Sequence, residues 1–253
     1  MTWQPVDCHA HTAMSDGALK VDELVERARE RGVRPSVADH ISRDVAGSIK
    51  SVEGVEAYLD TLDEYPVFRG GEFCWHDDLW REIPARLASR FTHRVGSLHA
   101  IHLPDGTRVH AFGRRMPDGL TPQAYMDAHL DELERFAAEM PVDILAHPTL
   151  VPISLRSLPA EELWTEAHED RLVNALQRAG IAFEVSNRYK AHERIVQRAV
   201  AAGLRISLGS DGHTADQVAN VAWPLALTRR LGVADEDLYD PAVHGSRTQE
   251  ARA

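Results

Sequence analysis

The sequence predicts an α/β fold in which parallel strands form a barrel. The first observation is that short apolar runs typical of strands alternate with amphipathic helical stretches along most of the chain, an order that gives a parallel sheet with helical crossovers. The second is that seven strand-like runs fall within one domain-length chain of 253 residues, which favours a closed barrel over an open sheet. The third is that histidines and carboxylates recur where these runs end, and in a parallel barrel those ends share one face.

The elements are assigned in order along the chain. The first strand-like run ends in DCHAH, where the alternation of a strand puts His9 and His11 on one face. A helix is expected over 21–31, because its apolar residues recur at helical spacing and Gly32 follows as a C-cap. The later strand-like runs are VRPSVADH, PVFRGGEFCW, RVGSLHAIHL, VDILAHPTL, IAFEVSN and LRISLGSD, and the later helical stretches are 52–65, 121–140, 159–179 and 191–202. Residues 74–94 and the LPDGTRV turn are expected to be insertions.

Length and composition indicate one domain. We assign 1–232 to this domain and 233–253 to a polar C-terminal tail whose last ten or so residues are expected to be loose. No apolar run reaches about 18 residues and MTWQPVD lacks the features of a signal peptide, so we expect a cytoplasmic protein that does not bind a membrane. Two cysteines are too few for a disulfide framework. The net charge of -11 argues against nucleic-acid binding and favours a small substrate, while the oligomeric state is left open.

Nine side chains that can bind metal fall at strand ends or in the loops that follow. β propensity favours Val, Ile or Thr at strand positions, so a His or carboxylate at strand after strand needs another explanation. A set of six imidazoles and three carboxylates suits two to three divalent zinc, manganese or iron ions better than calcium or magnesium. The nine are His9, His11, Asp16, His40, Glu72, His99, His147, Asp211 and His213.

Other histidines and the cysteines have a different expected role. His102 and His110 lie near the expected site, but we do not count them in it. Cys8 and Cys74 flank ligand positions and are expected to be inert buried thiols. Asp16 has an alternative role as the cap of a helix that begins near Lys20. The remaining histidines are expected to be surface or structural residues: His76, His93, His129, His168, His192 and His244.

Six motifs together resemble those of the PHP (polymerase and histidinol phosphatase) superfamily. They are DCHAHTAMSDG, the ADH that ends at His40, the Glu of GGEF, GSLH, AHP and GSDGH, and they follow one another in order from Asp7 to His213. The resemblance implies a distorted seven-stranded (β/α) barrel with a trinuclear metal site on its C-terminal face. It also implies that the enzyme hydrolyses phosphate esters.

The resemblance also implies a division of the ligands among three ions. His9, His11, Glu72 and Asp211 would hold one ion, and Glu72 would bridge it to a second ion held also by His99 and His147. Asp16, His40 and His213 would hold the third. Some relatives have His at the position of Asp16, and an Asp there gives a harder site. Glu72, Asp211 and His213 are expected to be catalytic as well as metal-binding.

The leading hypothesis is a phosphomonoesterase that acts on a small organic phosphate, either histidinol phosphate or a nucleotide-like ester. A hydroxide that bridges two metal ions would attack phosphorus. The ions would leave the pocket cationic and suited to an anion, and Arg43 and Arg188 could add a charged fork for phosphate, although each could equally be a surface charge. Two alternatives stay open: an amidohydrolase-like enzyme that attacks a carbonyl, and a non-catalytic metal-binding module.

Overall fold

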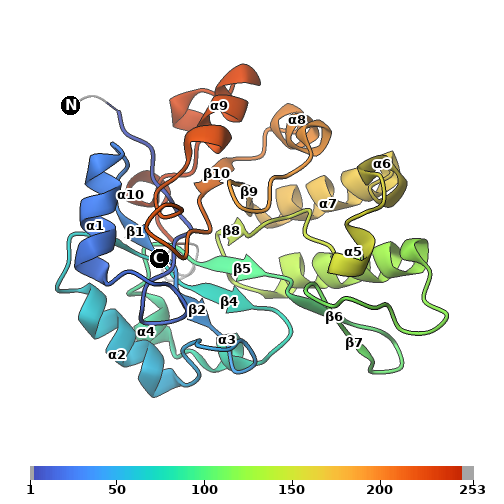
Figure 1. Cartoon of the computed structure of the whole chain (residues 1–253), viewed down its shortest axis with the longest axis horizontal. Helices are drawn as coiled ribbons and strands as arrows, with labels where there is room; N and C mark the ends of the chain where they lie inside the picture. The colour runs from blue at the N-terminus through green and yellow to red at the C-terminus, as the bar shows by residue number, and fades with distance from the viewer. Residues whose placement is uncertain (1–2, 247–253) are drawn as a thin grey trace.

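A six-stranded parallel sheet forms the centre of the computed structural model, which describes residues 3–246 (Figure 1). The strands are ordered β10-β9-β8-β5-β4-β2, and every neighbouring pair is parallel. All their residues are buried. Their bounds are β2 His40–Ile41, β4 Glu72–Cys74, β5 Val95–Ser97, β8 Ile144–Leu145, β9 Ala182–Ser186 and β10 Ile206–Gly209. The architecture is therefore α/β with a mostly parallel central sheet, as the alternating pattern predicts.

The predicted first strand is an extended segment with only isolated bridges. On one side the amide of Cys8 donates to the carbonyl of Leu208 at 2.9 Å, and on the other the amide of Ala38 donates to the carbonyl of Ala10 at 2.8 Å. The segment therefore lies between β10 and the residues that lead into β2. Two short strands that precede β2 and β4 in the chain, β1 (Ser36–Val37) and β3 (Phe68–Arg69), pair parallel in a small sheet of their own.

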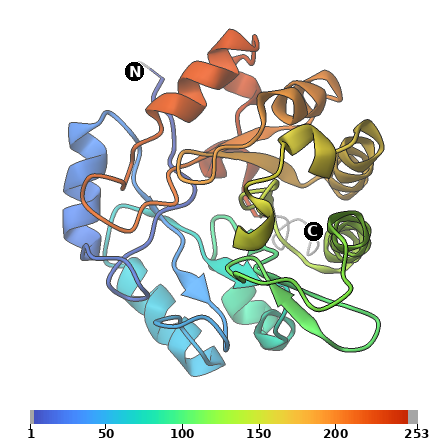
Figure 2. The same ribbon diagram turned by 45° about the vertical axis from the view of Figure 1, so that its right-hand side comes forward.

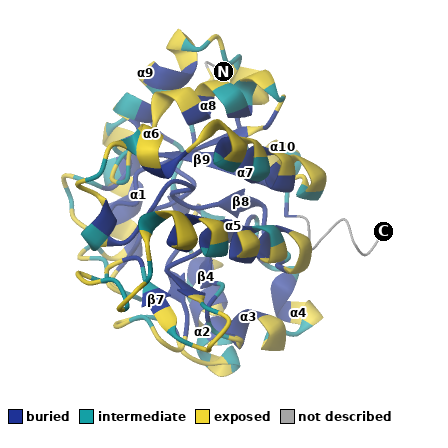
Figure 3. Cartoon of the chain, turned by 90° about the vertical axis from the view of Figure 1, so that its right-hand side faces the viewer, coloured by how far each residue is buried: buried dark blue, intermediate teal, exposed yellow. Residues whose placement is uncertain are grey.

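Helices surround the sheet and turn their apolar faces toward it (Figures 2 and 3). Five lie where the periodicity predicts them: α1 Val21–Glu30, α2 Val52–Leu62, α5 Pro122–Glu139, α7 Glu166–Ala179 and α8 Glu193–Ala201. The predicted stretch 159–179 is broken at buried Trp164 into α6 (Ala160–Leu163) and α7, because Thr165 caps α7 by accepting from the amide of His168. Helix α9 (Ala222–Arg230) was not predicted.

The run RVGSLHAIHL forms two strands instead of one. Strand β5 ends at Ser97, and β6 (Ala100–His102) pairs antiparallel with β7 (Arg108–His110) in a hairpin beside the sheet. His99 therefore follows the end of β5, as His147 follows the end of β8. The LPDGTRV turn joins β6 to β7, and residues 74–94 include two short helices, α3 (Leu79–Glu82) and α4 (Ala85–Ala88).

Part of the segment assigned to a polar tail packs under the sheet. The amide of Tyr239 donates to the carbonyl of Ile206 at 2.8 Å, and the side chains of Leu238 and Tyr239 are buried. A short helix, α10 (Pro241–His244), follows. The expectation of a loose end concerns mainly 247–253, which lie outside the described residues. Within 3–246, no helix combines the length and apolar character that crossing a membrane requires.

Candidate metal centre

The nine expected ligands converge on one face of the central sheet. Seven of them line a pocket of about 270 Å³: Asp16, His40, Glu72, His99, His147, Asp211 and His213. The other two, His9 and His11, are fully buried beside the pocket and contact the same carboxylates. His99 and His147 follow the ends of β5 and β8 as expected, whereas His40 and Glu72, which were expected to end their strands, are the first residues of the short strands β2 and β4. The parallel arrangement still brings these residues to one face of the sheet.

Three clusters of ligand atoms contain all nine residues. Within each cluster the atoms lie within 4.8 Å of one another. The clusters are His9, His11 and Asp211; Glu72, His99 and His147; and His11, Asp16, His40 and His213. This grouping resembles the division that the family resemblance implies, with two differences: Glu72 is grouped with His99 and His147 and not with His9, His11 and Asp211, and His11 also belongs to the third cluster.

The spacing of these atoms suits a metal ion better than direct hydrogen bonding. Glu72 Oε1, His99 Nε2 and His147 Nε2 form a triangle whose three sides are each 3.3 Å. Two ligand atoms on a tetrahedral ion, each about 2.1 Å from it, are about 3.4 Å apart. The corresponding distances around His11 Nε2 are 3.5 Å to Asp211 Oδ1 and 3.8 Å to Glu72 Oε2.

Several buried ring nitrogens lack a hydrogen bond. His9 Nε2 and both ring nitrogens of His11 have no hydrogen-bond partner among the described residues. A buried polar atom without a partner costs about 1–3 kcal/mol, so three such atoms that face carboxylates suit coordination of a cation. The donor set therefore fits divalent metal.

The pKa shifts of Glu72 and His11 favour metal binding, whereas the facing carboxylates outweigh burial and hold the pKa values of His9 and His40 well above the usual value. Burial acts to raise the pKa of Glu72, but the facing imidazoles of His40 and His99 outweigh it and hold that pKa well below the usual value. Burial, reinforced by the charge of His40, lowers the pKa of His11 to about 3. An ionised carboxylate and a neutral imidazole are the forms that bind metal.

Two of the expected ligands adopt left-handed backbone conformations. His147 has φ 33° and Asp211 has φ 49°. Such conformations cost about 1–3 kcal/mol for a residue other than glycine and persist where surrounding contacts impose them, often at functional sites. Here the amide of Asp211 donates to the carbonyl of His9 at 2.7 Å, and the amide of His147 donates to Glu184 Oε2 at 2.5 Å.

Glu184, on β9, is a site residue that the sequence reasoning missed. Its side chain is fully buried, and its Oε1 lies 2.7 Å from His9 Nδ1. One carboxylate therefore orients His9 and supports the strained backbone of His147. Gly209 gives it room, because a Cβ there would lie 2.1 Å from Glu184 Oε1. A charged residue in the middle of the apolar run IAFEVSN was the available signal.

Asp7 and Asp39 are two further supporting carboxylates that the sequence reasoning missed. Asp7 accepts from the amide of Ser210 at 2.7 Å, which ties the first segment to the loop that carries Asp211. Asp39 accepts from the amide of Thr12 at 2.7 Å and from the Ser15 hydroxyl, which fixes the loop that carries Asp16. Burial raises the pKa of each carboxyl to about 6.

Asp16 reaches the site from its loop and does not cap a helix. Its Oδ2 lies 3.3 Å from His213 Nε2 and 3.6 Å from His40 Nε2. Helix α1 has Lys20 as its N-cap, and the amide of Lys20 donates to the side chain of Glu23. The alternative of a cap at Asp16 is therefore wrong.

The two arginines expected to bind substrate lie in different places. Arg188 lines the pocket, with Nη1 2.5 Å from His213 Nδ1 and 3.7 Å from Asp211 Oδ1. Arg43 is exposed and makes a paired salt bridge to Glu82, at 2.8 and 2.6 Å. The structure therefore brings Arg188 to the site and leaves Arg43 outside the pocket lining.

Three histidines that were grouped as surface or structural residues are buried. His93 Nε2 lies 3.0 Å from the carbonyl of Cys8, which is a structural contact. His129, on α5, lies with its Nδ1 3.4 Å from the Tyr125 hydroxyl, and neither ring nitrogen of His76 has a hydrogen-bond partner among the described residues. His102 is exposed, whereas His110, which was not counted in the site, lines the pocket.

Cys74 is buried next to the ligands. Its Sγ lies 3.2 Å from His99 Nδ1, and together with His40 and His99 it could also hold a cation. Burial raises the pKa of this thiol, which disfavours the thiolate that metal binding requires. Its expected inert role stays a prediction. Cys8 is buried as well, and both cysteines are free.

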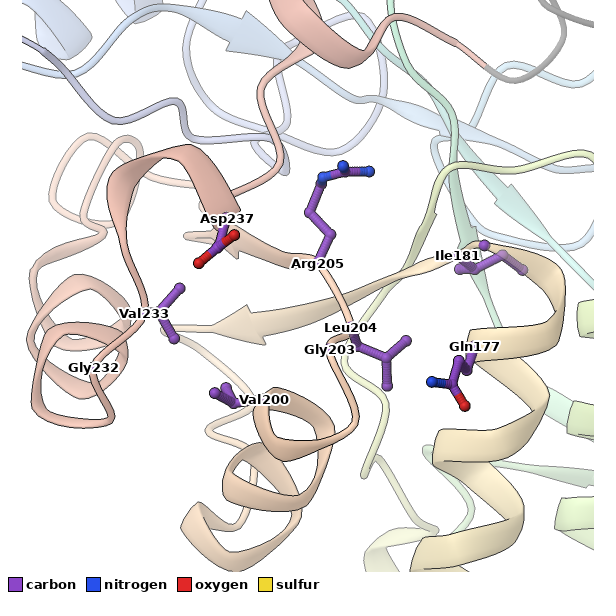
Figure 4. Close-up of a pocket in the computed structure, with 10 residues that line it drawn as sticks. Gln177, Ile181, Val200, Gly203, Leu204, Arg205, Gly232, Val233 and Asp237 are labelled. Atoms are coloured by element: carbon purple, nitrogen blue, oxygen red, sulfur yellow. The ribbon is translucent and has the colours of Figure 1, made fainter.

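A second cavity, of about 300 Å³, lies away from the ligands (Figure 4). Its lining comes from the ends of α7 and α8, the starts of β9 and β10, and Gly232, Val233 and Asp237 near the C-terminal side of α9. Asp237 is the only carboxylate among its described lining residues, and none is a histidine or cysteine. The site chemistry therefore belongs to the other pocket.

The comparisons show a shared fold. No family model and no curated protein matches the sequence. The histidinol phosphate phosphatase of Lactococcus lactis subsp. lactis Il1403, solved with zinc, L-histidinol and phosphate, superposes with a TM-score of 0.68 at 16% identity, over 91% of this chain and 95% of that one. A Listeria monocytogenes protein assigned as a histidinol phosphatase superposes with a TM-score of 0.66 at 14% sequence identity, over 85% of this chain and 97% of that one. The chain has the fold of these two structures.

Proposed function

We propose that this chain is a metal-dependent phosphoesterase of the PHP superfamily that hydrolyses a phosphate monoester of a small organic alcohol. The observation that carries the proposal is the convergence of six imidazoles and three carboxylates, in three clusters, on one pocket. The ordered motifs and the shared fold support the same family. We also infer that the sheet and the segment 6–11 close into a distorted seven-stranded barrel, since that segment hydrogen-bonds on both of its sides.

The residues present could hold two to three divalent ions of zinc, manganese or iron. The triangle of Glu72, His99 and His147 would hold one of them, and the other two clusters would hold the rest. When bound, such ions supply positive charge that activates water and stabilises the phosphoryl oxygens. Imidazole-rich ligand sets favour these metals over magnesium and calcium.

The chain's own residues orient the substrate. Arg188, at the pocket wall, carries guanidinium donors that can bind two phosphate oxygens. Glu184 fixes the His9 ring from behind, so that His9 Nε2 faces the pocket side. In the overall reaction, a water oxygen bonds to phosphorus, the bond from phosphorus to the ester oxygen breaks, and the alcohol leaves with a proton.

The substrate is proposed to be a small phosphate ester such as histidinol phosphate or a nucleotide-like compound. A pocket of about 270 Å³ suits a molecule of that size. The Lactococcus structure contains L-histidinol and phosphate, which are the two products of such a hydrolysis. The two free, buried cysteines suit a reducing compartment, and we propose that the enzyme acts in the cytoplasm.

The test is phosphate release from a panel of phosphate monoesters and diesters by protein reconstituted with zinc or manganese. Glu72→Gln should abolish release because this side chain faces His9, His40, His99 and His147. His102→Ala, on an exposed strand position, is the matched control and should keep full activity. No phosphate release across the panel, together with turnover of amides or lactones, would overturn the proposal in favour of a carbonyl-directed hydrolase.

A further inference from the structure

An aromatic surface forms part of the pocket wall beside the ligands. Phe112, which follows β7, and Tyr189, which follows β9, both line the pocket, with ring centroids 6.3 Å apart. The Phe112 ring also lies 5.7 Å from His99, and the Tyr189 ring 5.4 Å from His147. This aromatic wall therefore continues directly from the metal-binding imidazoles.

Phe112 is exposed although it is large and apolar. It is 42% exposed and is one of four exposed large hydrophobic residues in the described part of the chain. Another of the four, Ile153, lies next to it, since the amide of Ile153 donates to the carbonyl of Ala111. A large, exposed apolar side chain that lines a pocket is typical of a ligand-binding surface.

Arg156 holds the aromatic wall in place. Its Nη2 donates to the carbonyl of Ala111 at 3.1 Å and its Nε donates to the carbonyl of Val151 at 3.0 Å. Its guanidinium carbon lies 5.9 Å from the Phe112 ring and 5.7 Å from the Tyr189 ring. The wall is thus fixed before a ligand binds, which lowers the entropic cost of binding.

Small aliphatic side chains line another part of the pocket. Val45 and Ala46 come from the loop after β2. Strands β4, β5 and β8 separate β2 from β9 in the sheet, so this loop and the Tyr189 loop approach the pocket from different strands. A pocket with aromatic rings in one part and short aliphatic side chains in another can accept a flat group.

We propose that Phe112 and Tyr189 select phosphate esters whose alcohol carries a planar, unsaturated ring. This inference rests on the proposed phosphoesterase function, because it places the phosphate at the ligand clusters and the ring against the aromatic wall. Aromatic pairs contribute interaction energy beyond burial of area, so a planar ring should bind better than a saturated ring of equal size.

The experiment compares benzyl phosphate with cyclohexylmethyl phosphate, which share charge and carbon skeleton, on metal-reconstituted protein. We expect kcat/KM to favour the benzyl ester about fivefold, or about 1 kcal/mol. Phe112→Leu should bring the ratio close to one, because it removes the aromatic ring and keeps an apolar side chain at that position. Trp3→Leu is the matched control, an exposed aromatic side chain absent from the pocket lining, and should keep the ratio.

Direct binding gives a second measurement. Calorimetry with benzylphosphonate and cyclohexylmethylphosphonate, which are not cleaved, should show the same preference for the planar ring and its loss in Phe112→Leu. Hydrolysis of both esters at equal rates, with equal phosphonate binding, would overturn the aromatic selection and leave the phosphoesterase function standing. Phosphate release from neither of these esters nor from any member of the monoester and diester panel, with no preference between the phosphonates, would overturn both.

Discussion

Replacement of Glu184 by Gln tests the role of a buried carboxylate behind the ligands. In the native protein its Oε1 faces His9 Nδ1 at 2.7 Å and its Oε2 accepts from the amide of His147 at 2.5 Å. A carboxylate can accept both hydrogen bonds, whereas an amide has one acceptor and one donor end. Glu184→Gln must therefore change one of the two contacts while the side-chain shape stays the same.

Each orientation of the new amide has a defined cost. If the amide oxygen keeps the His147 contact, its NH₂ group faces His9 Nδ1 and forces the ring proton onto Nε2, the nitrogen that faces Glu72 Oε2 at 3.4 Å. A protonated Nε2 cannot bind metal. If the amide is reversed, two donors meet at His147, and a buried unsatisfied donor costs about 1–3 kcal/mol. Loss of such supporting contacts commonly lowers metal affinity about 10–100-fold.

The assay is metal content per chain after dialysis against graded concentrations of chelator, together with thermal unfolding of the metal-free protein. Glu169→Gln is the matched control, because Glu169 is also fully buried but pairs with Arg194 and Arg198 away from the ligands. The control should lose stability and keep metal affinity. If Glu184→Gln bound metal as tightly as the native protein and unfolded at the same temperature, the orienting role of Glu184 would be refuted.

Three further changes test separate parts of the account. Asp16→Asn should bind about one metal ion fewer and react at least about tenfold more slowly, which corresponds to an activation free energy higher by about 1.4 kcal/mol. Elemental analysis and rate measurements that showed unchanged metal content and an unchanged rate would contradict this. Burial lowers the pKa of His129 to about 4, below the unfolded value of about 6.5. The unfolded state therefore binds a proton first as the pH falls, and the free energy of unfolding decreases by about 2 kcal/mol between about pH 6.5 and pH 5. Denaturant titrations of His129→Leu should show a smaller decrease over this range, and an identical decrease would exclude His129 as its source. Gly209→Ala should lower both the melting temperature and the metal content, because the new Cβ would displace Glu184, and a variant that matched the native protein in both would show that the loop adapts.

The sequence could predict which strands carry the ligands. His147 follows β8 as expected, whereas His40 and Glu72 begin β2 and β4, and the parallel α/β order still brings all three to one face of the sheet. Precise strand pairing was not needed for this step. The break between β5 and β6 shows the limit, since His99 was predicted inside one strand and instead follows the end of β5.

The supporting residues could not be found in the same way. Glu184 contacts His9 across 175 positions of the chain, and Asp7 contacts Ser210 across 203 positions. Only the folded sheet sets such pairings, and no local periodicity reports them. The burial of Leu238 and Tyr239 was missed for a related reason, because two apolar residues in a polar segment do not reveal the surface that they cover.

The central claim is that the clustered side chains hold divalent ions at this pocket. Anomalous diffraction from crystals grown with zinc measures this directly. The account predicts two to three anomalous peaks, each about 2.0–2.2 Å from nitrogen or oxygen atoms of one cluster, including one bound by Glu72, His99 and His147. Crystals whose ring nitrogens and carboxylates show no anomalous peak within coordination distance at saturating zinc would contradict it.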